Sequence, residues 1–219
     1  MVEFNELLDQ VFTHFSGPGY QDRLTLAKQS YVDFAGPFDE DQIDIESKWI
    51  QFRDWYLYDF LYQGTSCISM VHEVPEISED LKESLQQARS SIYYFYKESR
   101  GWVYFRDLIT RDKIYFKNTD AILLLEKNRY IQTRLFRYNK DWYAGAYLTV
   151  HPQGSEKFID SKVKLIRKEK NIEVRLEMKI RLLDLIFRRF FQNLRFKQVD
   201  VRKIYADEPL FDRKAETRI

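Results

Sequence analysis

Few residues in this sequence have the type and spacing that enzyme chemistry requires. His72 and Glu73 follow Cys67 closely, which makes the three the nearest approach to a nucleophile and a base, yet no second motif supports them. Asp107 and Asp112 flank a predicted turn, where aspartates usually accept hydrogen bonds from the local backbone. There is no glycine-rich phosphate loop, Gly-x-Ser-x-Gly elbow or His-x-x-x-His pair. We therefore expect no catalytic residues and no enzyme activity.

Metal binding and disulfide formation need more ligand residues than this sequence offers. Cys67 is the only cysteine, so one chain can form neither an internal disulfide nor a thiolate-rich metal site. His14, His72 and His151 lie far apart and lack the spacing of metal ligands. We expect no metal and no cofactor.

Charge is distributed unevenly along the 219 residues, although the formal net charge is only +1. Residues 1–88 contain five Lys and Arg against seventeen Asp and Glu, whereas residues 161–205 contain fourteen against five. Such a split is typical of a basic surface for nucleic acid or acidic lipid, or of two regions that attract each other. No run approaches the roughly 20 apolar residues of a membrane span, and the N-terminal stretch is acidic. We expect a cytoplasmic protein.

Apolar periodicity predicts a helical lobe at the N-terminal end. Apolar residues between Phe4 and Phe15 recur at the i, i+3, i+4 spacing of one helix face, and glycine and proline at 16–19 end that helix. A second helix is expected over 21–34, followed by an acidic loop over 36–42. A further helix is expected over 78–90, with an N-cap serine and acidic residues in its first turn.

The segment WIQFRDWYLYDFLYQG, residues 49–64, has aromatic side chains on nearly every side of a predicted helix. Because a helix that is apolar all round is a buried one, we expect this to be the central helix of the lobe. Arg53 and Asp54 are expected on its remaining polar stripe. Asp59 is expected to have a specific hydrogen-bond partner, since a carboxylate is disfavoured at a helix C-terminus. The aromatic residues expected to be mostly buried are Trp49, Phe52, Trp55 and Tyr56.

After residue 90 the pattern changes from a helical period to alternation. Aromatic and branched residues separated by turn clusters predict five short antiparallel strands between 91 and 152. The stretch AILLLEKN among them fits a short strand or a helical turn equally well. From Ser155 onward helices are expected, and apolar residues from Leu176 to Leu194 recur at steps of four and three. Residues 172–180 also alternate with period two, so a strand remains an alternative there.

These elements predict an α+β fold with an N-terminal helical lobe, a five-stranded bent antiparallel sheet or small open barrel, and C-terminal helices. The expected divisions are an acidic helical lobe over 1–90, an aromatic β-sheet unit over 91–152, basic helices over 153–206 and a frayed tail over 207–219.

The aromatic helix and the strands that follow it resemble a loosely defined family of uncharacterised bacterial proteins. The shared pattern is a Phe-x-x-Trp-aromatic-Leu-aromatic-Asp helix followed by a small β-sheet, across roughly residues 24–152. The matching residues are Phe52, Trp55, Leu57, Asp59, Ser91, Asp107, Leu108, Thr110, Gly145 and Pro152. Some relatives carry a zinc motif of the SEC-C type, which this sequence lacks. The resemblance implies that the helix and sheet form one unit, and it supplies no activity.

Two non-catalytic functions fit these observations. The sequence favours a protein-interaction or adaptor module of a bacterial cytoplasm, because the C-terminal helix combines a wide apolar face with basic residues. We expect a partner of unknown identity or a homodimer; lipid binding uses the same residues, but acidic neighbours dilute the basic face. The residues expected to contact a partner are Phe187, Arg188, Arg189, Phe190, Leu194 and Arg195.

The alternative function is nucleic-acid binding by the aromatic sheet and the basic helix. A small sheet rich in Tyr and Phe offers stacking surfaces, and interleaved cations offer contacts to phosphates. The same aromatic residues would also suit the core of a bent sheet, and an acidic N-terminal lobe would repel phosphates. The candidate nucleic-acid contacts are Arg106, Arg111, Lys113, Arg134 and Arg137.

Overall fold

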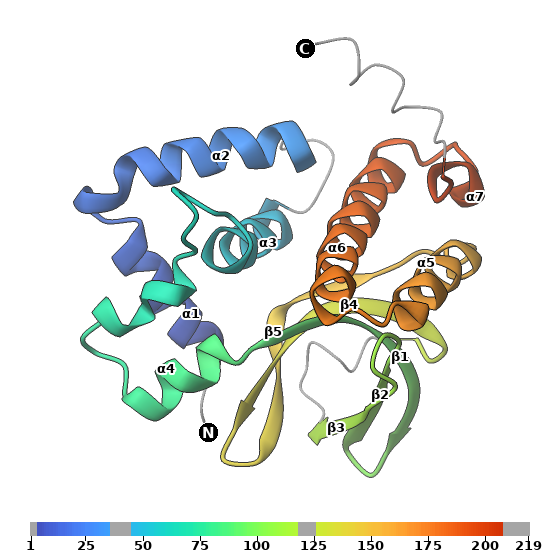
Figure 1. Cartoon of the computed structure of the whole chain (residues 1–219), viewed down its shortest axis with the longest axis horizontal. Helices are drawn as coiled ribbons and strands as arrows, with labels where there is room; N and C mark the ends of the chain where they lie inside the picture. Colours follow the sequence, from blue (N-terminus) through green and yellow to red (C-terminus); the bar gives the residue numbers. More distant parts are fainter. Residues whose placement is uncertain (1–3, 36–44, 118–125, 208–219) are drawn as a thin grey trace. The chain divides into compact units, whose positions relative to one another are not determined.

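The protein is α+β, with N-terminal helices, a five-stranded antiparallel sheet and C-terminal helices (Figure 1), which confirms the predicted fold class. The computed structural model describes residues 4–35, 45–117 and 126–207. The predicted acidic loop, most of the AILLLEKN stretch and nearly all of the predicted tail lie outside the described residues. Contacts divide the chain into two compact units, one formed by 1–90 with 133–148 and the other by 91–132 with 149–219.

The helices of the first unit form in the predicted regions, but the aromatic helix ends at Tyr58 rather than near residue 64, and the last helix ends at Gln86 rather than residue 90. Two short 3-10 helices, η1 and η2, join the α-helices. The elements are α1 (Phe4–Phe15), η1 (Pro18–Tyr20), α2 (Gln21–Ala35), α3 (Ile45–Tyr58), η2 (Ile68–Glu73) and α4 (Glu79–Gln86). Helix α3, which covers residues 49–58 of the aromatic segment, contacts both α1 and α2. Its position between two helices explains why so much of its surface is apolar.

Aromatic packing holds α3 against its neighbours. The Phe52 and Tyr56 side chains are completely buried. Phe52 makes edge-to-face contacts with Phe12 and Tyr31, at centroid distances of 6.4 and 5.2 Å. The Tyr56 hydroxyl donates a hydrogen bond of 2.6 Å to the carbonyl of Phe15, where α1 ends. Edge-to-face rings add to the free energy gained from area burial.

Parts of the prediction for α3 were wrong. Trp49, expected to be mostly buried, is 41% exposed, whereas Trp55 is partly buried in agreement with the prediction. Arg53 and Asp54, expected on a polar stripe, are both buried. Arg53 forms an ion pair with Asp9 of α1, so a charged partner on the neighbouring helix accompanies the burial of its side chain.

The sheet has the strand order β3-β2-β1-β4-β5. Its strands are β1 (Arg89–Ser99), β2 (Trp102–Asp107), β3 (Lys113–Lys117), β4 (Arg129–Tyr138) and β5 (Asp141–Val150). A two-residue turn at Arg100 and Gly101 joins β1 to β2, and both residues have positive φ angles, 54° and 75°. That backbone geometry matches the twist of a tight hairpin, and glycine adopts it without strain.

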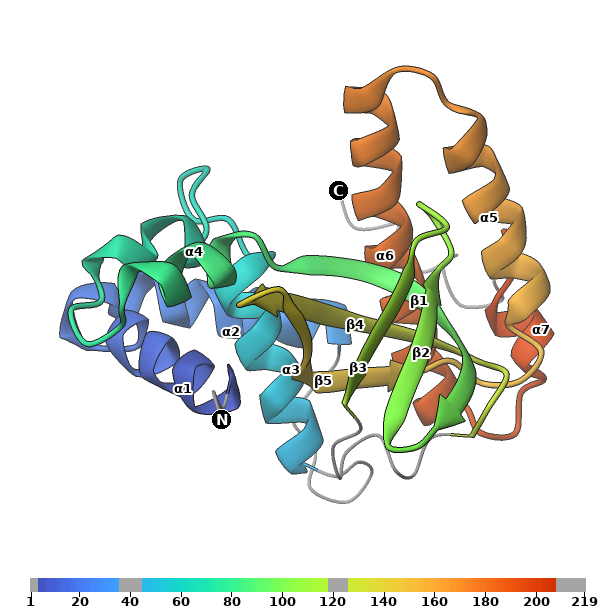
Figure 2. The ribbon, with the colours of Figure 1, turned by 90° about the horizontal axis from the view of Figure 1, so that it is seen from below.

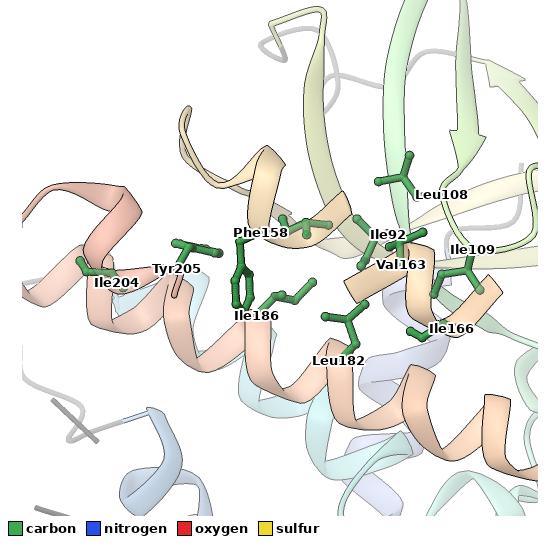
Figure 3. Packing of buried hydrophobic residues seen from close by; sticks show 11 residues of the cluster. Ile92, Leu108, Ile109, Phe158, Val163, Ile166, Leu182, Ile186, Ile204 and Tyr205 are labelled. Carbon is green, nitrogen blue, oxygen red and sulfur yellow. The ribbon is translucent and has the colours of Figure 1, made fainter. Parts of the chain in front are cut away.

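Two helices cover the start of β1 in the second unit. Helices α5 (Glu156–Lys168) and α6 (Ile172–Arg195) lie side by side as a hairpin (Figure 2), and the short helix α7 (Val201–Ile204) follows. Residues 172–180 are therefore helical. Side chains from strand ends and helices form one buried apolar cluster (Figure 3). Its members include Ile92, Leu108, Ile109, Phe158, Val163, Ile166, Leu182, Ile186, Ile204 and Tyr205.

No helix in the described ranges combines the length and apolar character needed to cross a membrane.

The aromatic packing of α3 predicts a large difference between two substitutions. Phe52→Ala should lower the free energy of unfolding by about 3–5 kcal/mol, because it leaves a cavity among packed rings. Trp49→Ala should cost well under half as much, because the Trp49 ring is already 41% exposed. Urea titration of both variants measures the difference. Equal losses would contradict this account of the helix.

Candidate nucleic-acid interface

The antiparallel register of β1, β2 and β3 sorts their side chains onto two different faces. On one face, Phe95 lies opposite Phe105, and Phe105 lies opposite Ile114. These side chains are buried, and the Phe105 ring packs edge-to-face on Phe116 at 5.2 Å. This face forms apolar core and offers nothing to a ligand.

The opposite face carries tyrosines, a tryptophan and cations, and we call it the aromatic face. Tyr104 lies opposite Tyr115, and Arg106 lies opposite Lys113. A register shift between Phe95 and Lys97 brings Tyr96 to this face, where its ring contacts those of its neighbours. The rings of the aromatic face are Tyr94, Tyr96, Trp102, Tyr104 and Tyr115.

The rings form a continuous series across the three strands. Neighbouring centroids are 6.4 Å apart from Tyr94 to Tyr96, 6.3 Å from Tyr96 to Tyr104 and 6.1 Å from Tyr104 to Tyr115. Trp102 continues the series, 5.8 Å from Tyr115. The Tyr115 side chain is 58% exposed, and the other four are half-buried. Each of these five residues therefore remains partly accessible to solvent.

Cations lie among and beside these rings. The Lys97 ammonium is 5.2 Å from the Tyr104 ring centroid, and the Arg106 guanidinium is 5.8 Å from that of Tyr96. Lys113 and Lys117 are exposed on β3, on the same face as Arg106 and Trp102 respectively. Among the described residues that the register and ring contacts place on this face, none is Asp or Glu. The local charge is therefore positive, although the whole chain is almost neutral.

Helix α5 closes one end of the aromatic face. The Tyr94 ring contacts Tyr130 of β4 edge-to-face at 5.9 Å. The Tyr130 hydroxyl donates a hydrogen bond of 2.8 Å to Asp160 of α5, and that of Tyr94 donates one of 2.6 Å to Asn128. Tyr94 and Tyr130 also pack against the buried cluster of the second unit. They anchor the face, and Trp102, Tyr104 and Tyr115 lie further along it.

The structure places the five predicted nucleic-acid residues in different environments. Arg106 and Lys113 are neighbours on the aromatic face, and Arg111 is exposed in the turn between β2 and β3. Arg137 is exposed on β4, with its guanidinium 5.9 Å from the Trp142 ring centroid. Arg134 is buried, which excludes it from a surface and corrects its assignment as a phosphate contact.

Arg134 forms an ionic cluster with Asp54 of α3 and with Asp59, which directly follows that helix. Its guanidinium bonds both oxygens of Asp54 at 3.2 Å and one oxygen of Asp59 at 2.9 Å. It also lies 3.8 Å from the centroid of the Tyr58 ring. Burial raises the pKa of Asp54, and the Arg134 charge opposes that rise. Asp59 thus has a specific hydrogen-bond partner, as expected, and that partner is Arg134.

The residues predicted to contact a protein partner are split between surface and interior. Phe187 and Arg189 are buried, so they cannot serve as a docking surface. Arg188 and Arg195 are exposed, while Phe190 and Leu194 are half-buried. The apolar periodicity does mark one face of α6, but that face includes buried core residues such as Phe187 and Phe191.

The environments of Cys67 and Asp107 indicate structural roles for these two residues. Burial raises the pKa of the Cys67 thiol to about 11, so the thiol is protonated at neutral pH. Asp107 accepts hydrogen bonds from the backbone N–H groups of Ile109 and Thr110, at 2.7 and 3.0 Å, as expected for a turn aspartate. No group of His, Cys, Asp and Glu side chains in the described ranges could hold a metal ion.

The sequence predicted two cations of the aromatic face, Arg106 and Lys113, but not Lys97, Lys117 or the individual rings. Tyr94, Tyr96, Trp102, Tyr104 and Tyr115 form the aromatic face, with Lys97 and Lys117 beside them. The signal was present in WVYFRD and KIYFK, where Trp or Tyr alternates with Val, Phe or Ile. Tyrosine and phenylalanine had been treated as equivalent core residues, although the tyrosine hydroxyl favours a position near water.

Comparison with known proteins gives a family without an assigned activity. A family of unknown function, DUF7986, matches residues 25–182, which is most of the chain. The chain belongs to this family. No curated protein and no solved structure gives a significant match.

Arg134 is buried and Arg106 is exposed, so substituting them should lower the free energy of unfolding by different amounts. Arg134→Met should lower the free energy of unfolding by about 3–5 kcal/mol, because it leaves the Asp54 carboxylate buried without its cation. Arg106→Ala, at an exposed position, should change it by less than about 0.5 kcal/mol. Urea titrations followed by far-UV circular dichroism compare the two. A small effect of Arg134→Met would show that the ionic cluster of Arg134, Asp54 and Asp59 is not needed for stability.

Proposed function

We propose that the aromatic face binds single-stranded nucleic acid. The observation that carries this proposal is the continuous series of five partly exposed rings with four cations on the same face, where the described residues include no carboxylate. The local charge of the face matters more for a ligand there than the near-neutral charge of the chain, because charges further away than about 10 Å are screened at ordinary salt concentrations.

Stacking would supply the sequence-independent part of the affinity. Every base has a flat π surface, and each base stacked on a protein aromatic ring contributes about 1–3 kcal/mol. Tyr115 and Trp102, at the open end of the aromatic face, are the first stacking positions. In a double helix the bases already stack on one another, so a sheet surface of this kind suits a single strand.

The cations would contact the phosphates between the stacked bases. Lys97 and Arg106 lie between the rings, and Lys113 and Lys117 lie along β3 at the edge of the sheet. A strand crossing the rings would therefore have a positive group within reach on either side. Neutralising phosphates releases counterions, so such binding weakens as salt is added.

The proposal predicts both ring dependence and salt dependence. Tyr115→Ala should weaken binding of a fluorescein-labelled oligouridylate by roughly 5-fold to 150-fold, which corresponds to the loss of one stack. In the wild type, log affinity should fall with log salt concentration at a slope near about −3 if four cations neutralise phosphates. Lys113→Ala with Lys117→Ala should reduce that slope to about half. Fluorescence anisotropy measures all three quantities.

Matched controls separate the aromatic face from general charge and ring content. Trp142→Ala removes a half-buried ring that also has a nearby arginine but belongs to β5. Lys157→Ala with Lys164→Ala removes two exposed cations from α5. Both controls should bind like the wild type. Absence of binding at low salt, or equal losses in the controls, would contradict the proposal.

Protein interaction through α6 is a second candidate, favoured by a different surface from the one the sequence suggested. Ile172, Leu176 and Ile180 recur at intervals of four and are 71%, 56% and 59% exposed. They form one apolar stripe on the first half of the helix, flanked by Arg175 and Lys179. Contiguous exposed apolar residues of this kind often mark protein contacts. We propose a second copy of this chain as the partner.

Light scattering at micromolar concentration tests the homodimer. Leu176→Asp with Ile180→Asp should convert a dimer to a folded monomer, because both residues are on the surface. Phe187→Asp should instead unfold the protein, because it places a charge at a buried position. A wild type with the mass of one chain would remove this second candidate.

A further inference from the structure

The second unit contains a basic cleft, and one of its lining residues, Arg111, is close in sequence to Lys113 of the aromatic face. Its volume is about 660 Å³, within the range of small-ligand sites. Four cations line it, namely Arg111 from the β2–β3 turn, Arg167 from the last turn of α5, and Arg175 and Lys179 from α6. The cleft therefore collects positive side chains from three separate segments.

Hydrogen bonds to the protein backbone hold Arg111 and Arg167 in position. The Arg167 guanidinium donates a hydrogen bond to the backbone carbonyl of Leu108, which connects α5 to the β2–β3 turn. Arg111 has a φ of 70°, and its N–H donates to the carbonyl of Asp107 at 2.9 Å. The Asp107 carboxylate in turn accepts two backbone N–H groups of the same turn. Two of the four cations are thus held on an ordered framework.

Positive charge predominates among the described residues that line the cleft. No carboxylate is among the described residues that line it. Asp107 and Asp160 attract Arg167 from outside the lining, but both accept hydrogen bonds from other groups. Burial lowers the pKa of Arg167, and the nearby Arg111 charge lowers it further. An anion placed between these two arginines would relieve their repulsion.

From this arrangement we propose that the cleft binds a phosphate monoester. Such a group carries close to two negative charges and three strong acceptor oxygens, and arginine binds phosphate oxygens in pairs. Ile172 and Leu176 also line the cleft, so the organic part of the ligand has apolar surface to rest against. The volume exceeds what a phosphate group alone would fill. The site is separate from the aromatic face and does not depend on the function proposed for it, but it shares Ile172 and Leu176 with the apolar stripe of the homodimer candidate.

The ligand could be a free phosphorylated metabolite or the phosphorylated end of a strand, and the chemistry at the cleft is the same. Arg111 lies two residues before Lys113 of the aromatic face. A strand on that face would therefore have its end within reach of the turn that carries Arg111. Paired probes that differ only in the phosphate separate the two sources.

Isothermal titration with adenosine 5′-monophosphate and with adenosine tests the site. The monophosphate should bind the wild type and adenosine should not. Arg175→Ala with Lys179→Ala should lower the affinity for the monophosphate by at least about tenfold, since two charge-assisted contacts are lost. Lys157→Ala with Lys164→Ala removes the same charge elsewhere and should bind like the wild type. Melting temperatures of both variants confirm that they are folded.

A 5′-phosphorylated oligouridylate and its 5′-hydroxyl form identify the source. A preference for the phosphorylated strand that the Arg175→Ala/Lys179→Ala variant loses would assign the cleft to strand ends. If the two oligouridylates bind with equal affinity and adenosine 5′-monophosphate also binds, the cleft is assigned to a free phosphorylated compound. The proposal is overturned if neither phosphorylated probe binds better than its unphosphorylated partner, or if the cleft variant binds like the control. Binding of the 5′-hydroxyl strand reports on the aromatic face alone.

Discussion

The antiparallel register of β1, β2 and β3 is the constraint on which the proposed function depends. Side chains alternate between the two faces of a strand, so a shift by one residue would exchange the faces. Phe105 and Phe116 would then meet solvent, and Tyr104 and Tyr115 would enter the core. The packing of Phe105 against Phe95 and Phe116 opposes that exchange. Core packing on one side therefore holds the tyrosines on the other side in place.

The β2–β3 turn links the two candidate sites of the second unit. Its Asp107 carboxylate holds the backbone of the turn, and Leu108 and Ile109 anchor it in the buried cluster. The same short segment then presents Arg111 to the cleft and leads into Lys113 on the aromatic face. A small, well-anchored turn can therefore supply cations to both surfaces without flexible loops.

Much of the fold could be predicted from sequence because period and turn chemistry are local. Periodicity over residues 4–15 indicates a helix, and the turn residues at 100 and 101 indicate a hairpin. Alternation of apolar and polar residues indicates the strands β2 and β3. The environment of Arg134 could not be predicted, because its partners Asp54 and Asp59 are some 80 and 75 residues away in the sequence. For the same reason Phe187 was assigned to a surface, since periodicity shows that a helix face is apolar but not what covers it.

Photo-crosslinking tests the central claim most directly, because it reports which residues a bound strand touches. A 4-thiouridine oligonucleotide is irradiated with the protein at low salt, and the adducts are located by mass spectrometry. The account predicts adducts on peptides that contain Tyr96, Trp102, Tyr104 or Tyr115, and their loss when unlabelled oligouridylate is added in excess. Adducts spread over α1 to α4, or none above the level of a control protein of equal charge, would contradict it.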